Sequence, residues 1–263
     1  MKLGPIYVLR DRTYDEMVNR IQNLKRQLDE VTKGDFRLTY QRLVTDLKKT
    51  MSEDEAMSRA VGGAFAEVGA LELALLQQLG LADGQYVVDV GCGSGRLAKP
   101  LSLAFKGDYL GIDVVPDLVR YAERIVARPS WRFEVADGLR IPEADGRADF
   151  ICFFSVFTHL RHEESYVYLR DAIRVARSGG RIVFSFLEFS VPTHWEILEY
   201  NLALMSSDRI EPLNQFMSRD LVEAWAKKLD VEIELIRRGD EAFIGAAGAQ
   251  AFGQSVAVLK KRA

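Results

Sequence analysis

The residues best suited to chemistry lie in a glycine-rich stretch. Residues 87–95 read Val-Val-Asp-Val-Gly-Cys-Gly-Ser-Gly, which predicts a buried strand, a tight turn and the start of a helix. Glycines in such a turn permit positive φ angles and let a ligand approach the backbone. The first turn of the helix offers free N–H groups and the positive end of the helix dipole. The pattern therefore favours a binding site for a nucleotide-like or polar ligand.

An acid follows at a distance that strengthens this interpretation. Asp113 lies eighteen residues after Gly95, at the predicted end of the next strand. A carboxylate there can accept hydrogen bonds from both hydroxyls of a ribose. The dinucleotide pattern GxGxxG would need a third glycine at position 96, which is Arg96, and this disfavours a nicotinamide dehydrogenase. No Lys-Ser or Lys-Thr follows the glycines, so the loop is no Walker A motif.

The elements around these residues alternate between strand and helix, which is typical of a parallel sheet with right-handed crossovers. Short apolar runs predict strands at 86–90, 109–112, 132–136, 149–154 and 181–187. Helical patterns lie between them, at 96–105, 116–127 and 163–176. Two further strands, 231–236 and 255–259, are predicted on either side of a stretch rich in glycine and alanine.

The first 80 residues predict helices only. Met17, Val18, Ile21, Leu24 and Leu28 recur at helical spacing, a second helix covers 39–49, a third begins at the capping box Ser52–Glu55, and a fourth ends at Gly80. We therefore divide the chain into a helical extension or lid, 1–80, and a sheet domain, 81–263, with a helical insertion at 188–217. Thr193 and Glu196 predict a capping box in that insertion. The N-terminal helices could also join two copies in a homodimer.

Composition and charge exclude several classes of protein. The 263 residues are 48% hydrophobic and 28% charged, with a net charge of −3, so the basic excess typical of a nucleic-acid binder is missing. No apolar run is long enough for a signal peptide or a membrane span. The cysteines, Cys92 and Cys152, form no CxxC pair and predict neither a zinc site nor a disulfide. We expect a cytoplasmic protein without a metal, a membrane insertion or a nucleic-acid partner.

Several motifs occur in one order, and together they resemble the class I S-adenosylmethionine-dependent methyltransferases over residues 70–260. The motifs are 88–95, 109–113, 135–138, 154–160 and 169–183. The resemblance implies an α/β, Rossmann-like, doubly wound sheet of seven strands, mostly parallel with one antiparallel strand near the edge. It also implies S-adenosylmethionine as the cofactor and S-adenosylhomocysteine as its product.

The resemblance further implies where this cofactor binds. The glycine loop would hold its methionine part, Asp113 its ribose, Asp137 and the Gly138 N–H its adenine, while Phe154 and Ser155 would lie near the reacting methyl. The expected cofactor-binding residues are Asp89, Gly91, Cys92, Gly93, Gly95, Asp113, Val114, Asp137, Gly138, Phe154 and Ser155.

His159 is the candidate for catalysis, because it follows strand four on the loop that would face the methyl donor. A neutral imidazole there could take a proton from a hydroxyl or an amine. The alternative is that His159 packs against the cofactor or bonds a loop carbonyl. His194 in the insertion is a second, weaker candidate.

The residues after strand four also narrow the acceptor. Residues 154–157 read Phe-Ser-Val-Phe, so they lack both the Pro-Pro-Tyr sequence of enzymes that methylate nucleic-acid amino groups and the carboxylate of metal-dependent enzymes. A small-molecule acceptor (a sugar, a lipid-linked compound or a secondary metabolite) methylated on a hydroxyl or an amine is the leading hypothesis. The alternative is a non-catalytic S-adenosylmethionine-binding protein of the same fold.

Overall fold

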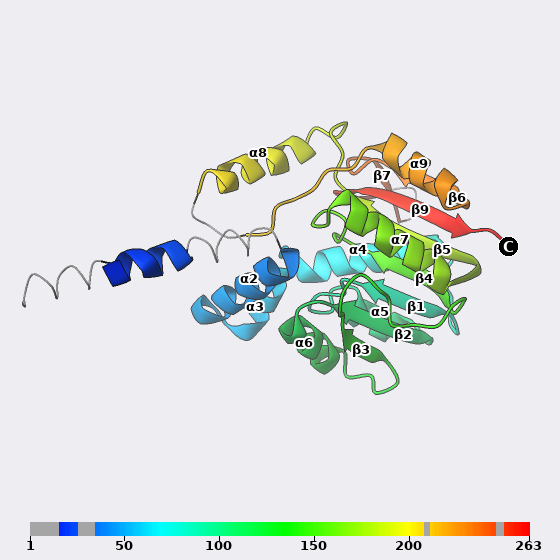
Figure 1. The fold of residues 1–263 in the computed structure, drawn as a ribbon. Coiled ribbons are helices and arrows are strands. Elements are labelled where there is room, and N and C mark those ends of the chain that lie inside the picture. Colours follow the sequence, from blue (N-terminus) through cyan, green and yellow to red (C-terminus); the bar gives the residue numbers. More distant parts are fainter. Residues whose placement is uncertain (1–15, 26–34, 208–210, 246–249) are drawn as a thin grey trace, which may run out of the picture.

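A computed structural model describes residues 16–25, 35–207, 211–245 and 250–263, and its centre is a seven-stranded sheet (Figure 1). The strand order is β3-β2-β1-β4-β5-β9-β6. Neighbours from β3 to β5 pair in parallel, whereas β9 is antiparallel to both β5 and β6. This confirms the predicted sheet with one antiparallel strand. The strands are β1 Tyr86–Val90, β2 Asp108–Asp113, β3 Arg132–Val135, β4 Ala148–Phe153, β5 Ala176–Phe186, β6 Val231–Arg237 and β9 Ser255–Lys261.

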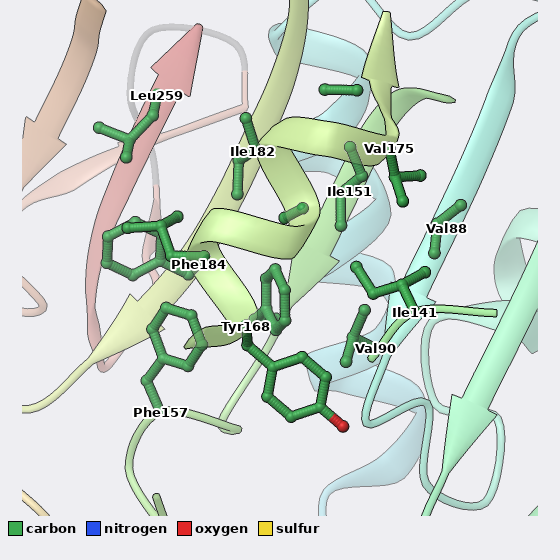
Figure 2. Close-up of a cluster of buried hydrophobic side chains, with 14 of the residues drawn as sticks. Val88, Val90, Ile141, Ile151, Phe157, Tyr168, Val175, Ile182, Phe184 and Leu259 are labelled. Atoms are coloured by element: carbon green, nitrogen blue, oxygen red, sulfur yellow. The ribbon is translucent and has the colours of Figure 1, made fainter. Parts of the chain in front are cut away.

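Helices cover both faces of the sheet, because the central strands are apolar on both sides. On one face, α7 (His162–Val175) packs against Val88, Ile151 and Phe184 (Figure 2). α9 (Arg219–Lys228) contributes Val222 and Ala226 to the same core. On the other face, α4 (Phe65–Gln78), α5 (Ala98–Ala104) and α6 (Pro116–Val126) pack against Val87 and Phe150. Odd and even residues of β1 point into different hydrophobic cores, because the side chains of a pleated strand alternate between its two faces.

The N-terminal helices pack beside this sheet domain. Residues 16–25 are helical, as the spacing of Met17 to Leu24 predicts, and Leu28 of the same pattern lies outside the described residues. α2 (Phe36–Thr50) and α3 (Glu53–Ala60) pack on α6 through Val44, Met57 and Leu118. The predicted capping box Ser52–Glu55 is confirmed at the start of α3. Since α6 follows directly after Asp113, these contacts hold α2 and α3 next to the end of β2.

The insertion after β5 contains α8 (His194–Met205), which Figure 1 shows at one side of the sheet. The predicted capping box at Thr193 is wrong, because Thr193 is already helical (φ −67°, ψ −20°) and its side chain accepts no cap hydrogen bond. The chain begins to turn earlier: the N–H of His194 donates to the carbonyl of Val191 at 3.1 Å. Nε2 of the buried His194 bonds the carbonyl of Gly253 at 2.9 Å, which fastens the insertion to the segment before β9.

Two smaller features differ from the sequence prediction. β5 begins five residues early, because Ala148 pairs with Ala176 and Phe150 with Arg181, so 177–180 form a bulge within the strand. Before β9, β7 (Ala242–Ile244) and β8 (Gln250–Ala251) form a separate two-stranded sheet. Among the described residues no single helix has the length and hydropathy of a membrane span, although the bent pair α3–α4 passes that test on length and composition alone.

Candidate functional site

The main cavity, about 470 Å³ in volume, lies at the carboxyl ends of β1, β2 and β4. Open α/β sheets bind ligands at this edge, and the volume is within the range of small-molecule sites. The structure brings together nine of the twelve predicted site residues on its wall, whereas Gly95, Asp137 and Gly138 are not part of that wall. The nine are Asp89, Gly91, Cys92, Gly93, Asp113, Val114, Phe154, Ser155 and His159.

The glycine loop forms the floor beside β1. Gly91 and Gly93 have φ angles of 74° and 54°, a region that strongly favours glycine. A Cβ on Gly93 would lie 2.5 Å from Cγ1 of Val61, a residue between α3 and α4. A Cβ on Gly95 would lie 3.1 Å from Cβ of Ala122 in α6. The glycines therefore allow close packing of the helices as well as a tight turn, and Gly95 serves the helix contact.

Asp113 ends β2 with its carboxylate already oriented. Its Oδ2 accepts from the N–H of Gly93 at 3.0 Å and its Oδ1 from the N–H of Val115 at 2.9 Å. A carboxylate has about four acceptor positions, so each oxygen keeps one for a further donor. Burial raises the pKa of Asp113 to about 6, although the backbone N–H groups oppose this shift. The geometry suits a diol such as a ribose.

Asp89 has a protein partner instead. The hydroxyl of Tyr109 donates to its Oδ2 at 2.7 Å, and Asp89 is buried. Burial raises the pKa of Asp89 to about 7, even though the bond from Tyr109 lowers it. The neighbouring Cys92 is also buried, which raises its thiol pKa well above the ordinary value and argues against a thiolate nucleophile.

The third predicted motif lies at the margin of the cavity. Ala136 lines the cavity, whereas Asp137 is exposed to solvent. Gly138, with φ at 87°, accepts a hydrogen bond from the Tyr168 hydroxyl through its carbonyl and lines a second cavity of about 310 Å³. That second cavity shares His159 with the first.

His159 stands where the two cavities meet. Its Nδ1 lies 3.3 Å from the carbonyl of Leu213, so Nδ1 carries the proton and Nε2 keeps a lone pair. Burial lowers the pKa of His159 to about 4, which leaves the ring neutral at ordinary pH. The other candidate, His194, is buried with both ring nitrogens bonded to backbone groups of Glu188 and Gly253, and it does not line the main cavity. Within the described ranges, no group of three or more His, Cys, Asp or Glu side chains could hold a metal ion.

The sequence analysis predicted a lid at 1–80 but did not name the residues of this segment that line the cavity. Phe36, Tyr40 and Leu43 from α2 line it. The ion pair of Arg96 and Glu72 also lines the cavity. Nη2 of Arg96 lies 2.7 Å from Oε1 of Glu72, and the Glu72 side chain in α4 is only 1% exposed. A signal for Glu72 existed in the sequence, since it is a single charge within the apolar run 68–76. The α2 residues carried none, because core and cavity-lining aromatics share the same helical spacing.

Comparisons with known proteins agree with this geometry. Residues 87–180 match the family described as "Methyltransferase domain". Tocopherol O-methyltransferase of Arabidopsis thaliana is 34% identical over 37% of this chain and 28% of that protein. Ajmaline N-methyltransferase of Rauvolfia serpentina is 30% identical over 37% of this chain and 34% of that protein. The chain thus spans about a third of the length of these curated relatives.

Solved structures show the same fold at low identity. A methyltransferase of Haloferax volcanii, in complex with the Trm112 methyltransferase activator, gives a TM-score of 0.63 at 15% identity, over 85% of this chain and 98% of that chain. Magnesium protoporphyrin IX methyltransferase of Synechocystis, with bound S-adenosylhomocysteine, gives 0.55 at 17% identity, over 80% and 95%.

The described residues have the α/β methyltransferase fold, with a cavity at the carboxyl edge of the sheet. Residues 87–180 carry a methyltransferase domain, and a solved structure of the same fold holds S-adenosylhomocysteine.

Proposed function

We propose that this chain transfers the methyl group of S-adenosylmethionine to a hydroxyl or an amine of a small molecule. The observation that carries the proposal is a single cavity that joins the glycine loop and Asp113 to a second half walled by Phe154, Phe252 and Gln254, with α2 also lining the cavity. One half suits the cofactor, and the other leaves room for an acceptor under a helical roof. The named relatives that methylate small molecules on oxygen or nitrogen support the same class of acceptor.

The cofactor half would be used as follows. The remaining acceptor positions of Asp113 receive the two ribose hydroxyls, while Gly91 and Gly93 let the methionine part approach the backbone. Ala136 and Val114 form an apolar wall for the adenine. Asp137, on the solvent side, would accept from the adenine amino group. When bound, S-adenosylmethionine supplies an electrophilic methyl group on a sulfonium.

The residues of the chain then align the acceptor and exclude water. The roof from α2 closes the cavity, which favours an in-line approach of the acceptor to the methyl group. His159 presents the lone pair of Nε2 and would accept a hydrogen bond, or a proton, from the acceptor. Its low pKa makes it a weak base, so orientation of a hydroxyl or an already neutral amine is its main contribution.

Calorimetry with S-adenosylhomocysteine and NAD tests the cofactor, and methyl transfer from labelled S-adenosylmethionine to hydroxylated and amino compounds tests the reaction. Binding of S-adenosylhomocysteine in a 1:1 complex is the expected result, and tighter binding of NAD would contradict the proposal. Binding without transfer to any compound would favour a non-catalytic S-adenosylmethionine-binding protein.

We also propose that the N-terminal helix joins two copies of the chain. Met17, Ile21 and Leu24 are 53–57% exposed and share one face of the helix at 16–25, which lies apart from the sheet in Figure 1. An apolar stripe of this kind is typical of helix pairing. Light scattering on the chain and on Ile21→Glu should show a dimer and a monomer, respectively, and a monomeric parent chain would contradict the proposal. A cytoplasmic location stays a prediction.

A further inference from the structure

Gln254 lines the half of the cavity that is farthest from Asp113. In the strand order β2-β1-β4-β5-β9, β1 and β4 separate Asp113 from β5, and Ser255 at the start of β9 pairs with Phe186 at the end of β5. Gln254, the residue before Ser255, therefore lies at the same carboxyl edge of the sheet. It is separated from the glycine loop after β1 by β4 and β5. It faces the space that the proposed function assigns to the methyl acceptor.

Two serines fix the orientation of the Gln254 amide. Its Oε1 lies 2.7 Å from Oγ of Ser185 and 3.3 Å from Oγ of Ser155. Oγ of Ser185 also accepts from the backbone N–H of Ser155 at 2.7 Å. Ser185 is fully buried, so its own hydroxyl hydrogen needs an acceptor, and Oε1 supplies one. The amide oxygen is thus turned toward the serines and Nε2 away from them.

The backbone of Ser155 supports this network. Ser155 has a φ angle of 59°, an unusual value for a residue other than glycine. Such conformations persist where the surroundings hold them, and they concentrate at ligand sites. Here the strained turn sends the Ser155 N–H to Ser185. Among the described residues, Nε2 of Gln254 donates to no protein acceptor, which leaves two N–H bonds for a ligand.

The neighbouring walls are aromatic. The rings of Phe154 and Phe252 have centroids 5.5 Å apart, and both line the cavity. Flat apolar walls next to a fixed N–H donor suit a flat ligand that carries an oxygen at one edge. Resting on the proposed function, we propose that Nε2 of Gln254 donates to an oxygen of the methyl acceptor. The acceptor class is a planar, unsaturated compound with a carbonyl or carboxylate oxygen.

A matched pair of probes tests this assignment. Acetophenone and ethylbenzene differ in one carbonyl group, and saturation-transfer NMR measures the binding of each to the protein loaded with S-adenosylhomocysteine. One uncharged hydrogen bond should make acetophenone bind about fivefold more tightly than ethylbenzene. In Gln254→Glu, Oε1 still accepts from both serines while an anionic oxygen replaces the donor, so the preference should vanish or reverse. Gln254→Met, which keeps the length without polar atoms, should also abolish it.

The control is Gln77→Glu, which adds the same charge on an exposed position of α4 outside the cavity. It should keep the parent preference. The role of Gln254 is overturned if acetophenone binds no more tightly than ethylbenzene. It is also overturned if the preference for acetophenone survives in both Gln254 variants. Neither result contradicts the proposed function. Failure of the parent protein to bind S-adenosylhomocysteine overturns the proposed function instead, so the two failures are distinguishable. Unchanged affinity of each variant for S-adenosylhomocysteine shows that its site is folded.

Discussion

The ring of Tyr40 in α2 meets the ring of His159 edge to face, with centroids 5.1 Å apart. Tyr40 comes from the N-terminal helices and His159 from the loop after β4, so the contact connects the roof of the cavity to the sheet domain. Burial raises the pKa of the Tyr40 hydroxyl, which keeps the phenol protonated at neutral pH. The pair therefore sets a protonated phenol and a neutral imidazole next to each other in the wall of the cavity.

Removing the Tyr40 ring should loosen the roof. Tyr40→Ala should destabilise the protein by about 1–2 kcal/mol, less than a fully buried aromatic because the side chain is only half-buried. It should also raise KM for the acceptor, whereas Tyr40→Phe keeps the ring contact and should retain stability. Urea unfolding and steady-state kinetics measure both effects. Equal stability of Tyr40→Ala and the parent would show that α2 docks without this contact.

Loss of the Asp113 carboxylate should weaken the cofactor site. Asp113→Ala removes the acceptor for two ribose hydroxyls. Because hydrogen bonds to a charged group contribute about 1.5–3 kcal/mol each, affinity for S-adenosylhomocysteine should fall by about tenfold or more. Asp83→Ala, at a position outside the cavity, is the matched control. Calorimetry measures both. An unchanged dissociation constant in Asp113→Ala would remove the ribose assignment.

The two pKa shifts in the site predict different pH effects. Asp113 has a raised pKa of about 6 and, in the proposed function, binds the cofactor as a carboxylate, so we expect cofactor affinity to fall as the pH drops through that value. His159 has a pKa lowered to about 4, so its lone pair is lost only below that pH. KM for S-adenosylmethionine should therefore rise at a higher pH than the one at which kcat declines. A kcat that falls together with affinity near pH 6 would contradict this order.

The lowered pKa of His159 also has a consequence for stability. Between about pH 4 and its ordinary value of 6.5, the unfolded histidine binds a proton that the folded one does not. This group therefore makes the protein less stable as pH falls through that window. In His159→Asn this part of the pH dependence of the free energy of unfolding should disappear.

The same variant, His159→Asn, tests a catalytic role. A turnover loss of roughly 10²-fold without a change in cofactor affinity would support that role, and full activity would contradict it.

Gly93 should resist substitution for two separable reasons. Gly93→Ala combines a φ angle of 54° with a Cβ 2.5 Å from Val61, so cofactor binding should weaken strongly. The double variant with Val61→Ala relieves the contact but keeps the strained φ angle, and it should recover part of the affinity. Normal binding by Gly93→Ala would show that the loop tolerates a side chain.

Residues 1–65 of the helical extension or lid and the insertion 188–217 should change in mobility on binding. We expect faster amide hydrogen exchange in α2 and α8 without ligand and slower exchange with S-adenosylhomocysteine, because α2 and the 212–214 segment line the cavity. The β1–β4 pairing should be protected in both states. Equal protection of α2 and α8 with and without ligand would favour a rigid roof.

The order of the elements and the floor of the site followed from the sequence, because both depend on local patterns. Glycines at 91 and 93 and an acid at 113 lie at strand ends that the apolar runs already mark. Parallel strands bring their carboxyl ends to one edge, so these residues had to meet. The capping box at Ser52 was confirmed for the same reason, since its partners are three residues apart.

The tertiary structure alone decided which residues of the roof line the cavity and which groups the polar side chains contact. Tyr40, Glu72 and Gln254 reach the cavity through packing between elements far apart in the chain, which no local period records. Gly95 shows the converse, since its spacing suggests a ligand while α6 packs against it, and Asp89 lines the cavity but also accepts a hydrogen bond from Tyr109. Whether a side chain binds a ligand or another group of the protein depends on which atoms lie within a few ångströms of it in the folded chain. Burial then shifts the pKa of the side chain and so determines its charge.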